Sequence, residues 1–142
     1  MQTVLKEKLW AYIVHHNPDL MFRLQEDYSV TRYLEEKVAS IMPRAAELLS
    51  ENRPMYIIEE LCLNAMTEDL KPSRYLYLLS VLEDEFSPDY ERLKESGTLT
   101  YEVCNLIEAC KGIFEALGFS SENEENRLLR YAIIGQVQEY LV

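Results

Sequence analysis

Apolar residues recur along this chain at intervals of three and four positions, the spacing of helices that bury one face. No stretch sustains the strict alternation of apolar and polar residues that is typical of a half-buried strand. The spacing predicts helices over residues 3–16, 30–50, 54–69, 74–86, 101–117 and 122–141, with a short helix opened by Pro18. We therefore expect an all-α fold, a single-domain multi-helix orthogonal bundle of about six or seven helices over residues 1–142.

Two stretches leave the pattern open. Pro43 lies inside the apolar stripe of residues 30–50, where a proline removes one backbone hydrogen bond and clashes with the preceding turn. A kink near residues 39–43 is expected there, with two separate helices as the alternative. Residues 87–99 give a weaker signal, in which Pro88 predicts a helical turn that Gly97 ends.

Short polar residues mark the expected helix starts. The candidates that stand just before an apolar run are Asn17, Ser29, Ser73 and Thr100. For the last helix, Ser121 and Glu124 have the spacing of a capping box, in which each side chain accepts a backbone N–H of the other's turn. We therefore expect the last helix to begin just after Ser121.

The last helix contains a glycine in its interior, although glycine costs ~1 kcal/mol there relative to alanine. Gly135 stands beside Ala132 at the edge of an apolar stripe that includes Leu129. Two small side chains leave a shallow groove that a second helix can enter, so close packing can offset the cost. This interpretation predicts that Gly135→Leu destabilises the protein by steric overlap.

Tyrosine is abundant, with ten residues in the chain. A buried tyrosine adds apolar area and needs a partner for its hydroxyl, whereas an exposed one suits a binding surface. The sequence is compatible with both roles for each tyrosine, and a core or boundary position is the commoner one. The positions expected to make helix contacts are Tyr75, Phe86, Leu129, Ala132 and Gly135.

The charge is strongly acidic, with 14 basic against 25 acidic residues and a net charge of −11. Nucleic acids and anionic lipids bind proteins through Lys and Arg that neutralise phosphates, and the basic residues here are scattered. We expect no direct nucleic-acid binding and no membrane association.

The apolar run Leu9 to Val14 is too short for a signal peptide. Three cysteines without paired spacing indicate reduced thiols, so a cytoplasmic location is expected.

Residue types that carry catalysis or bind metals are sparse. His15 and His16 are the only histidines, and neighbours on a helix point about 100° apart. Neither has a glutamate three residues before it, as a carboxylate-bridged di-iron bundle requires. Cys104 lies on an apolar helix face without a histidine base nearby in the sequence. No glycine-rich phosphate loop is present. We expect no enzymatic activity, no metal and no cofactor.

Three segments resemble a known family: "HHNPDL" at residues 15–20, "KPSRYLYLLSVLEDEF" at 71–86 and "NRLLRYAIIGQVQEYL" at 126–141. They are similar to an uncharacterised all-helical family, a domain of unknown function, from Bacteroides-type bacteria. The matching positions are Ser73, Tyr75, Leu78, Glu85, Phe86, Leu129, Gly135, Val137 and Leu141. The turn "RAAELLSENRP" departs from the family pattern, which has a glycine there. The resemblance implies an all-helical fold and genes carried on mobile elements, and it implies no activity.

These observations favour a small acidic helical protein that acts through protein–protein contact, as an accessory protein of a mobile element. A homodimer is the default association for such a domain. One alternative is an acidic inhibitor that mimics nucleic acid and blocks a DNA-binding protein. Another is a small-ligand-binding domain with a pocket between its helices. The sequence does not identify the protein partner or the ligand.

Overall fold

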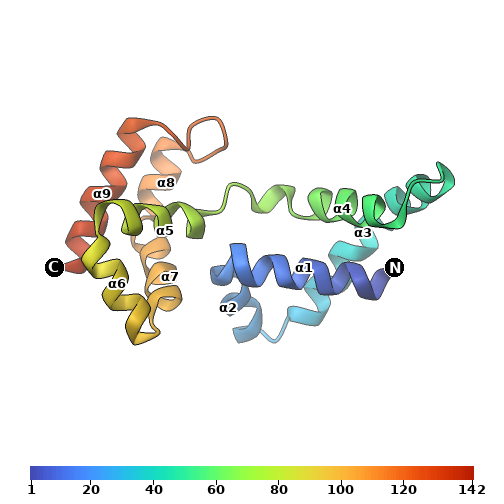
Figure 1. The fold of residues 1–142 in the computed structure, drawn as a ribbon, viewed down its shortest axis with the longest axis horizontal. Coiled ribbons are helices and arrows are strands. Elements are labelled where there is room, and N and C mark those ends of the chain that lie inside the picture. The colour runs from blue at the N-terminus through green and yellow to red at the C-terminus, as the bar shows by residue number, and fades with distance from the viewer. The chain divides into compact units, whose positions relative to one another are not determined.

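The computed structural model describes all of residues 1–142; it is 81% helical without strands, which confirms the all-α prediction. The helices are α1 (Gln2–His16), α2 (Pro18–Glu26), α3 (Val30–Ser50), α4 (Met55–Met66), the 3₁₀ helix η1 (Glu68–Leu70), α5 (Arg74–Glu85), α6 (Ser87–Ser96), α7 (Leu99–Ala109), α8 (Lys111–Leu117) and α9 (Arg127–Leu141). Figure 1 traces them in chain order. Nine α-helices therefore replace the smaller number expected.

Two segments account for the additional helices. Ser87–Ser96 is a full helix rather than a single turn, because Pro88 stands in the first turn, where proline is tolerated. Gly97 then ends it in the left-handed conformation with φ +76°, as the sequence predicted. The long apolar stripe that ends at Leu117 is divided at Cys110, whose φ of −95° and ψ of 0° turn the chain between α7 and α8.

The chain divides into two compact units, residues 1–70 and 71–142, each with its own hydrophobic core. Each unit is a helical assembly that buries apolar stripes of several helices against one another. One domain over residues 1–142 stays a prediction.

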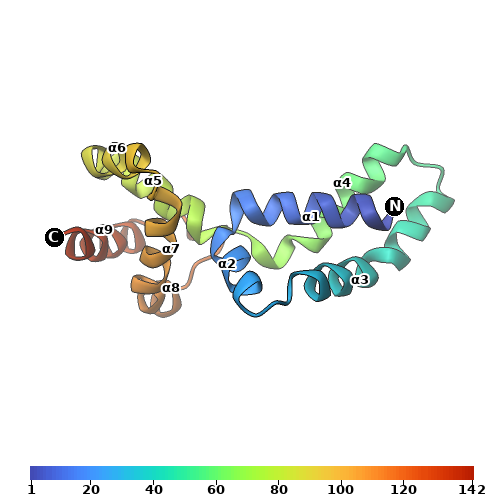
Figure 2. The same cartoon turned by 90° about the horizontal axis from the view of Figure 1, so that it is seen from below.

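In residues 1–70, α1 packs against α2, α3 and α4 (Figure 2). The buried core consists of Leu5, Leu9, Ile13, Leu20, Leu24, Val38, Ala45, Leu48, Ile58, Cys62 and Met66. Pro43 lies inside a continuous α3, so the alternative of two separate helices is wrong. Figure 2 shows α3 bending along its length, and proline is the common cause of such a bend.

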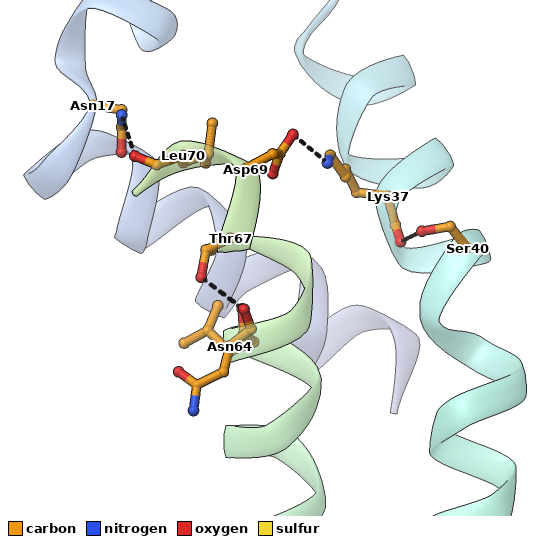
Figure 3. Close-up of polar contacts among 8 residues, drawn as sticks. Asn17, Lys37, Ser40, Asn64, Thr67, Asp69 and Leu70 are labelled. Carbon is orange, nitrogen blue, oxygen red and sulfur yellow. Dashed lines mark hydrogen bonds and ion pairs between the residues drawn. The ribbon is translucent and has the colours of Figure 1, made fainter. Parts of the chain in front are cut away.

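Polar contacts hold the end of this unit in place (Figure 3). Asn17 precedes α2 as predicted, but its side chain does not cap that helix. Its Nδ2 donates to the carbonyl oxygen of Leu70 at 3.4 Å. Lys37 on α3 pairs with Asp69 on η1, with Nζ 2.9 Å from Oδ2. The buried Thr67 donates its hydroxyl to a carbonyl in the last turn of α4 at 2.8 Å. The first two contacts tie η1 to the start of α2 and to α3, and the third closes the last turn of α4.

In residues 71–142, α5 packs against α6 and α7, and α9 packs against α7 and α8. The buried core consists of Tyr75, Leu78, Val81, Leu82, Val103, Leu106, Ile107, Cys110, Phe114, Leu129, Ile133 and Val137. Ser73 caps α5 as predicted, since its Oγ accepts the N–H of Leu76 at 3.1 Å. Thr100 lies inside α7 and does not cap it; its Oγ1 is 3.3 Å from the hydroxyl of Tyr75.

The start of α9 differs from the predicted capping box at Ser121 and Glu124. Residues 120–125 are bends and turns, and the helix begins only at Arg127. The side chain of Asn123 stabilises this turn, because its Oδ1 accepts the N–H of Ser120 at 2.6 Å. The competing local hydrogen bond keeps the chain out of the helical conformation at the capping-box positions.

Asn126 is the residue that caps α9. Its Oδ1 accepts the N–H groups of Leu128 at 2.8 Å and Leu129 at 3.2 Å, and its own backbone is extended. Two of the orphan donors at the helix start are therefore satisfied by one side chain.

We expect Asn126→Ala to lower the free energy of unfolding by about 1 kcal/mol, because those two N–H groups lose their acceptor. Ser121→Ala is the matched control and should change it by less than about 0.5 kcal/mol. Urea unfolding followed by circular dichroism measures both. A larger loss for Ser121→Ala than for Asn126→Ala would mean that the helix begins at the capping box.

Candidate functional site

The outer face of α9 carries exposed apolar side chains. The helix buries Leu129, Ile133 and Val137, which are four residues apart. On the other side, Leu128 is 72% exposed and Tyr131 is 66% exposed. Figures 1 and 2 both show α9 at the periphery of residues 71–142. A regular helix thus presents a leucine and a tyrosine to the exterior.

Four residues on this face follow one line at four-residue steps, the row along which side chains of a helix lie one above the other. They are Arg127, Tyr131, Gly135 and Glu139, which we call the α9 row. Three of them are exposed beside Leu128, and Gly135 leaves the backbone bare in the middle of the row.

The structure corrects the packing expected at Gly135. A Cβ built at this position meets no atom within 4 Å, so no helix of residues 71–142 packs closely on it. The close packing that would make Gly135→Leu overlap at its first side-chain carbon is therefore absent within residues 71–142. The physical reason is that α9 buries the face opposite to Gly135. Ala132, one turn earlier, is half-buried at the boundary between the two faces.

The other expected contact positions lie in or against the core. Tyr75 and Leu129 are buried, with 8% and 1% of their surface exposed. Phe86 is half-buried and packs against the same core. Ala132 and Gly135 do not join these side chains. The five positions expected to make helix contacts therefore include three in or against the core and two that lie outside it.

We expect Gly135→Ala to raise the free energy of unfolding by about 1 kcal/mol, because the site is an open helix interior where alanine is favoured. Ala132→Gly is the reverse substitution on the same helix and should lower it by a similar amount. Urea unfolding of dilute protein measures both. If Gly135→Ala destabilised the protein, the site would be more crowded than the open space observed.

A cleft of about 520 Å³ adjoins the α9 row between α5 and the start of α9. Its lining residues are Tyr77, Ser80, Asp84, Glu124, Glu125, Arg127, Arg130 and Tyr131. Arg130 spans it towards α5, with its Nη2 at 3.3 Å from Asp84 and 3.8 Å from a carboxylate oxygen of Glu85. Arg127 and Tyr131 belong both to the cleft and to the α9 row.

Tyr77 gives this cleft an unsatisfied polar group. Its hydroxyl oxygen is buried and has no partner at full hydrogen-bond geometry, and the guanidinium of Arg130, 5.9 Å from the ring centroid, is the nearest donor that could hydrogen-bond it. The ring is held edge-on against Phe114 and Phe119, with centroids 5.9 and 5.1 Å away. Burial raises the pKa of Tyr77, and the nearby Arg130 partly opposes this effect. Because buried polar groups are almost always paired, an unpaired one beside a cleft needs an explanation.

The remaining candidates for chemistry are spread over the chain. Burial raises the pKa of the Cys110 thiol to about 11, and it also raises the pKa of Cys62. Both thiols are therefore protonated at neutral pH and weak as nucleophiles. His16 stacks on Tyr12 at the end of α1, with ring centroids 4.1 Å apart. No three His, Cys, Asp or Glu side chains are gathered where they could hold a metal ion.

A second exposed apolar patch lies at the turn between α3 and α4. Its residues are Leu49, Met55 and Tyr56, which are 45%, 49% and 69% exposed. The residues around it include no helix-interior glycine and no ordered row of charges. It therefore matches the outer face of α9 in apolar exposure and lacks its glycine and its row of charges.

Comparisons with protein-family models, curated proteins and solved structures found no match. The family resemblance therefore rests on the sequence segments alone. None of the helices combines the length and apolar content that a membrane span requires.

Proposed function

We propose that the protein acts through protein–protein contact and that the outer face of α9 is its contact surface. The observation that carries this proposal is the exposure of Leu128 and Tyr131 beside a glycine with open space above it. Neighbouring exposed apolar side chains that form a continuous surface mark interaction sites, and tyrosine is enriched where binding energy concentrates. A helix or groove of a partner protein fits such a surface.

Gly135 supports the same conclusion from its energetic cost. The glycine costs α9 ~1 kcal/mol, and no close contact within residues 71–142 offsets this cost. A partner that packs on the α9 row can approach the bare backbone closely, so that dispersion contacts compensate on binding. The groove predicted from the sequence thus becomes an intermolecular one in this proposal.

The biological setting belongs to the proposal too. Membership in the helical family and an accessory role in a mobile element are supported by the three resembling segments. A cytoplasmic location is supported by three cysteines that form no disulfide. The net charge of −11 is the support for the alternative of an acidic nucleic-acid mimic.

The test compares two exposed tyrosines of similar exposure, Tyr131 at 66% and Tyr56 at 69%. Tagged wild type, Tyr131→Ser and Tyr56→Ser are used to capture proteins from host lysate at two salt concentrations, followed by mass spectrometry. We expect Tyr131→Ser to lose the partner and Tyr56→Ser to retain it. Retention by Tyr131→Ser with loss by Tyr56→Ser would assign the contact to the turn between α3 and α4 instead.

A second candidate function, binding of a small polar ligand, is favoured by the unpaired hydroxyl of Tyr77 in the cleft. A ligand group that hydrogen-bonds this hydroxyl would satisfy it. Without a ligand, Tyr77→Phe should raise the free energy of unfolding by about 1 kcal/mol, because it removes a buried unsatisfied group. A thermal-shift screen of small polar compounds should stabilise wild type and leave Tyr77→Phe unchanged. A less stable Tyr77→Phe would mean that the hydroxyl is already satisfied.

A further inference from the structure

We infer that the outer face of α9 pairs with the same face of a second copy of this chain, the two helices running antiparallel about a two-fold axis. This inference rests on the proposed function, because it names the partner of the same surface. The order of residue types in the α9 row carries it: a cation, an aromatic ring, a glycine and an anion at four-residue steps.

A two-fold axis through the middle of this row pairs unlike residues. The axis lies level with residue 133, halfway between Tyr131 and Gly135. Residues at equal distances on either side then face each other across the interface, so Tyr131 faces Gly135 of the second copy. Arg127 correspondingly faces Glu139 of the second copy. By symmetry each contact occurs twice.

Both contacts are complementary in this arrangement. The ring of Tyr131 fills the space that the missing side chain of Gly135 leaves open, so that a ridge on one helix enters a groove on the other. The guanidinium of Arg127 meets the carboxylate of Glu139. A parallel pairing would place Arg127 against Arg127 and Glu139 against Glu139. Charge complementarity therefore selects the antiparallel arrangement.

The two charges are unusual for an isolated helix. Arg127 is the first residue of α9 and Glu139 lies near its last turn, and the helix has no acidic residue in its first turn and no basic one in its last. The helix dipole disfavours both placements. Neither side chain forms an ion pair within the chain. Their contribution to α9 itself is thus unfavourable, whereas both are satisfied across the antiparallel pair.

The size of the surface sets the expected strength. One pair of helices of this length buries less than the ~1,600 Å² of a standard interface. The association is therefore weak and depends on protein concentration. Exposed ion pairs contribute little each, but reversing one sign turns both symmetric attractions into repulsions.

The experiment is sedimentation velocity on the full chain over a concentration series that extends well above micromolar. The samples are wild type, Arg127→Glu, Glu139→Arg, the double variant, and an equimolar mixture of the two single variants. Wild type should dimerise, and each single variant should dimerise roughly tenfold more weakly. The double variant and the mixture restore both opposite-charge contacts, so each should recover dimerisation.

Folding is controlled independently, because Arg127→Glu and Glu139→Arg each place a charge that the helix dipole favours. Both single variants should melt no lower than wild type in circular dichroism. A wild type that stays monomeric throughout overturns the inference, and so do single variants that dimerise as wild type does.

The dimer and the proposed contact surface can fail independently of each other. A monomeric wild type whose heterologous partner is lost on Tyr131→Ser would leave the contact surface in place and remove only the second copy as its occupant. A monomeric wild type that loses no partner on Tyr131→Ser would overturn both.

Discussion

Burial of one face of α9 determines which of its residues face outward. Leu129, Ile133 and Val137 are each at most 1% exposed. Each buried side chain of this size contributes about 1.5–3 kcal/mol, so the helix cannot rotate about its axis without losing much of that burial. With the rotation fixed, every residue of the α9 row faces outward. The exposed tyrosine and the open glycine follow directly from this anchoring.

The start of the helix extends the same constraint. Asn126 ends the preceding turn and begins α9, which sets Arg127 at the first helical position. Arg130 then lies on the side of the helix that faces α5, where it pairs with Asp84. The cleft and the α9 row thus share one helical turn. A ligand in the cleft and a protein on the row would contact some of the same side chains, including Tyr131.

Most helices could be predicted from the sequence, because a helix that buries one face has apolar residues at intervals of three and four positions. Ser73 is a clear example, since a lone serine before an apolar run became the cap of α5. The break at Cys110 could not be predicted, because the apolar period continues across it. Ser121 was wrong as a cap because Asn123 forms a competing turn that depends on side-chain geometry.

The site was predictable only in part. The sequence singled out Gly135, whose cost in a helix is visible without a structure. The sequence did not show whether Gly135 faces the core or the exterior. Its neighbours Ala132 and Leu129 suggested that it belongs to the apolar stripe that faces the core. The positions of Leu128 and Tyr131 could have shown its direction. Both lie outside the series of buried residues at four-residue steps that begins at Leu129. Which surface is left uncovered depends on how the other helices pack, and spacing alone does not give that.

Photo-crosslinking from position 131 tests whether the outer faces of α9 from two copies meet. A benzophenone amino acid replaces Tyr131, and equal amounts of ¹⁴N- and ¹⁵N-labelled protein are mixed and irradiated. Mass spectrometry of the peptides separates links between copies from links within one chain. We expect mixed-isotope crosslinks from position 131 to residues around Gly135 of the other copy. Crosslinks between copies to any other surface, or none at concentrations well above micromolar, would contradict this pairing.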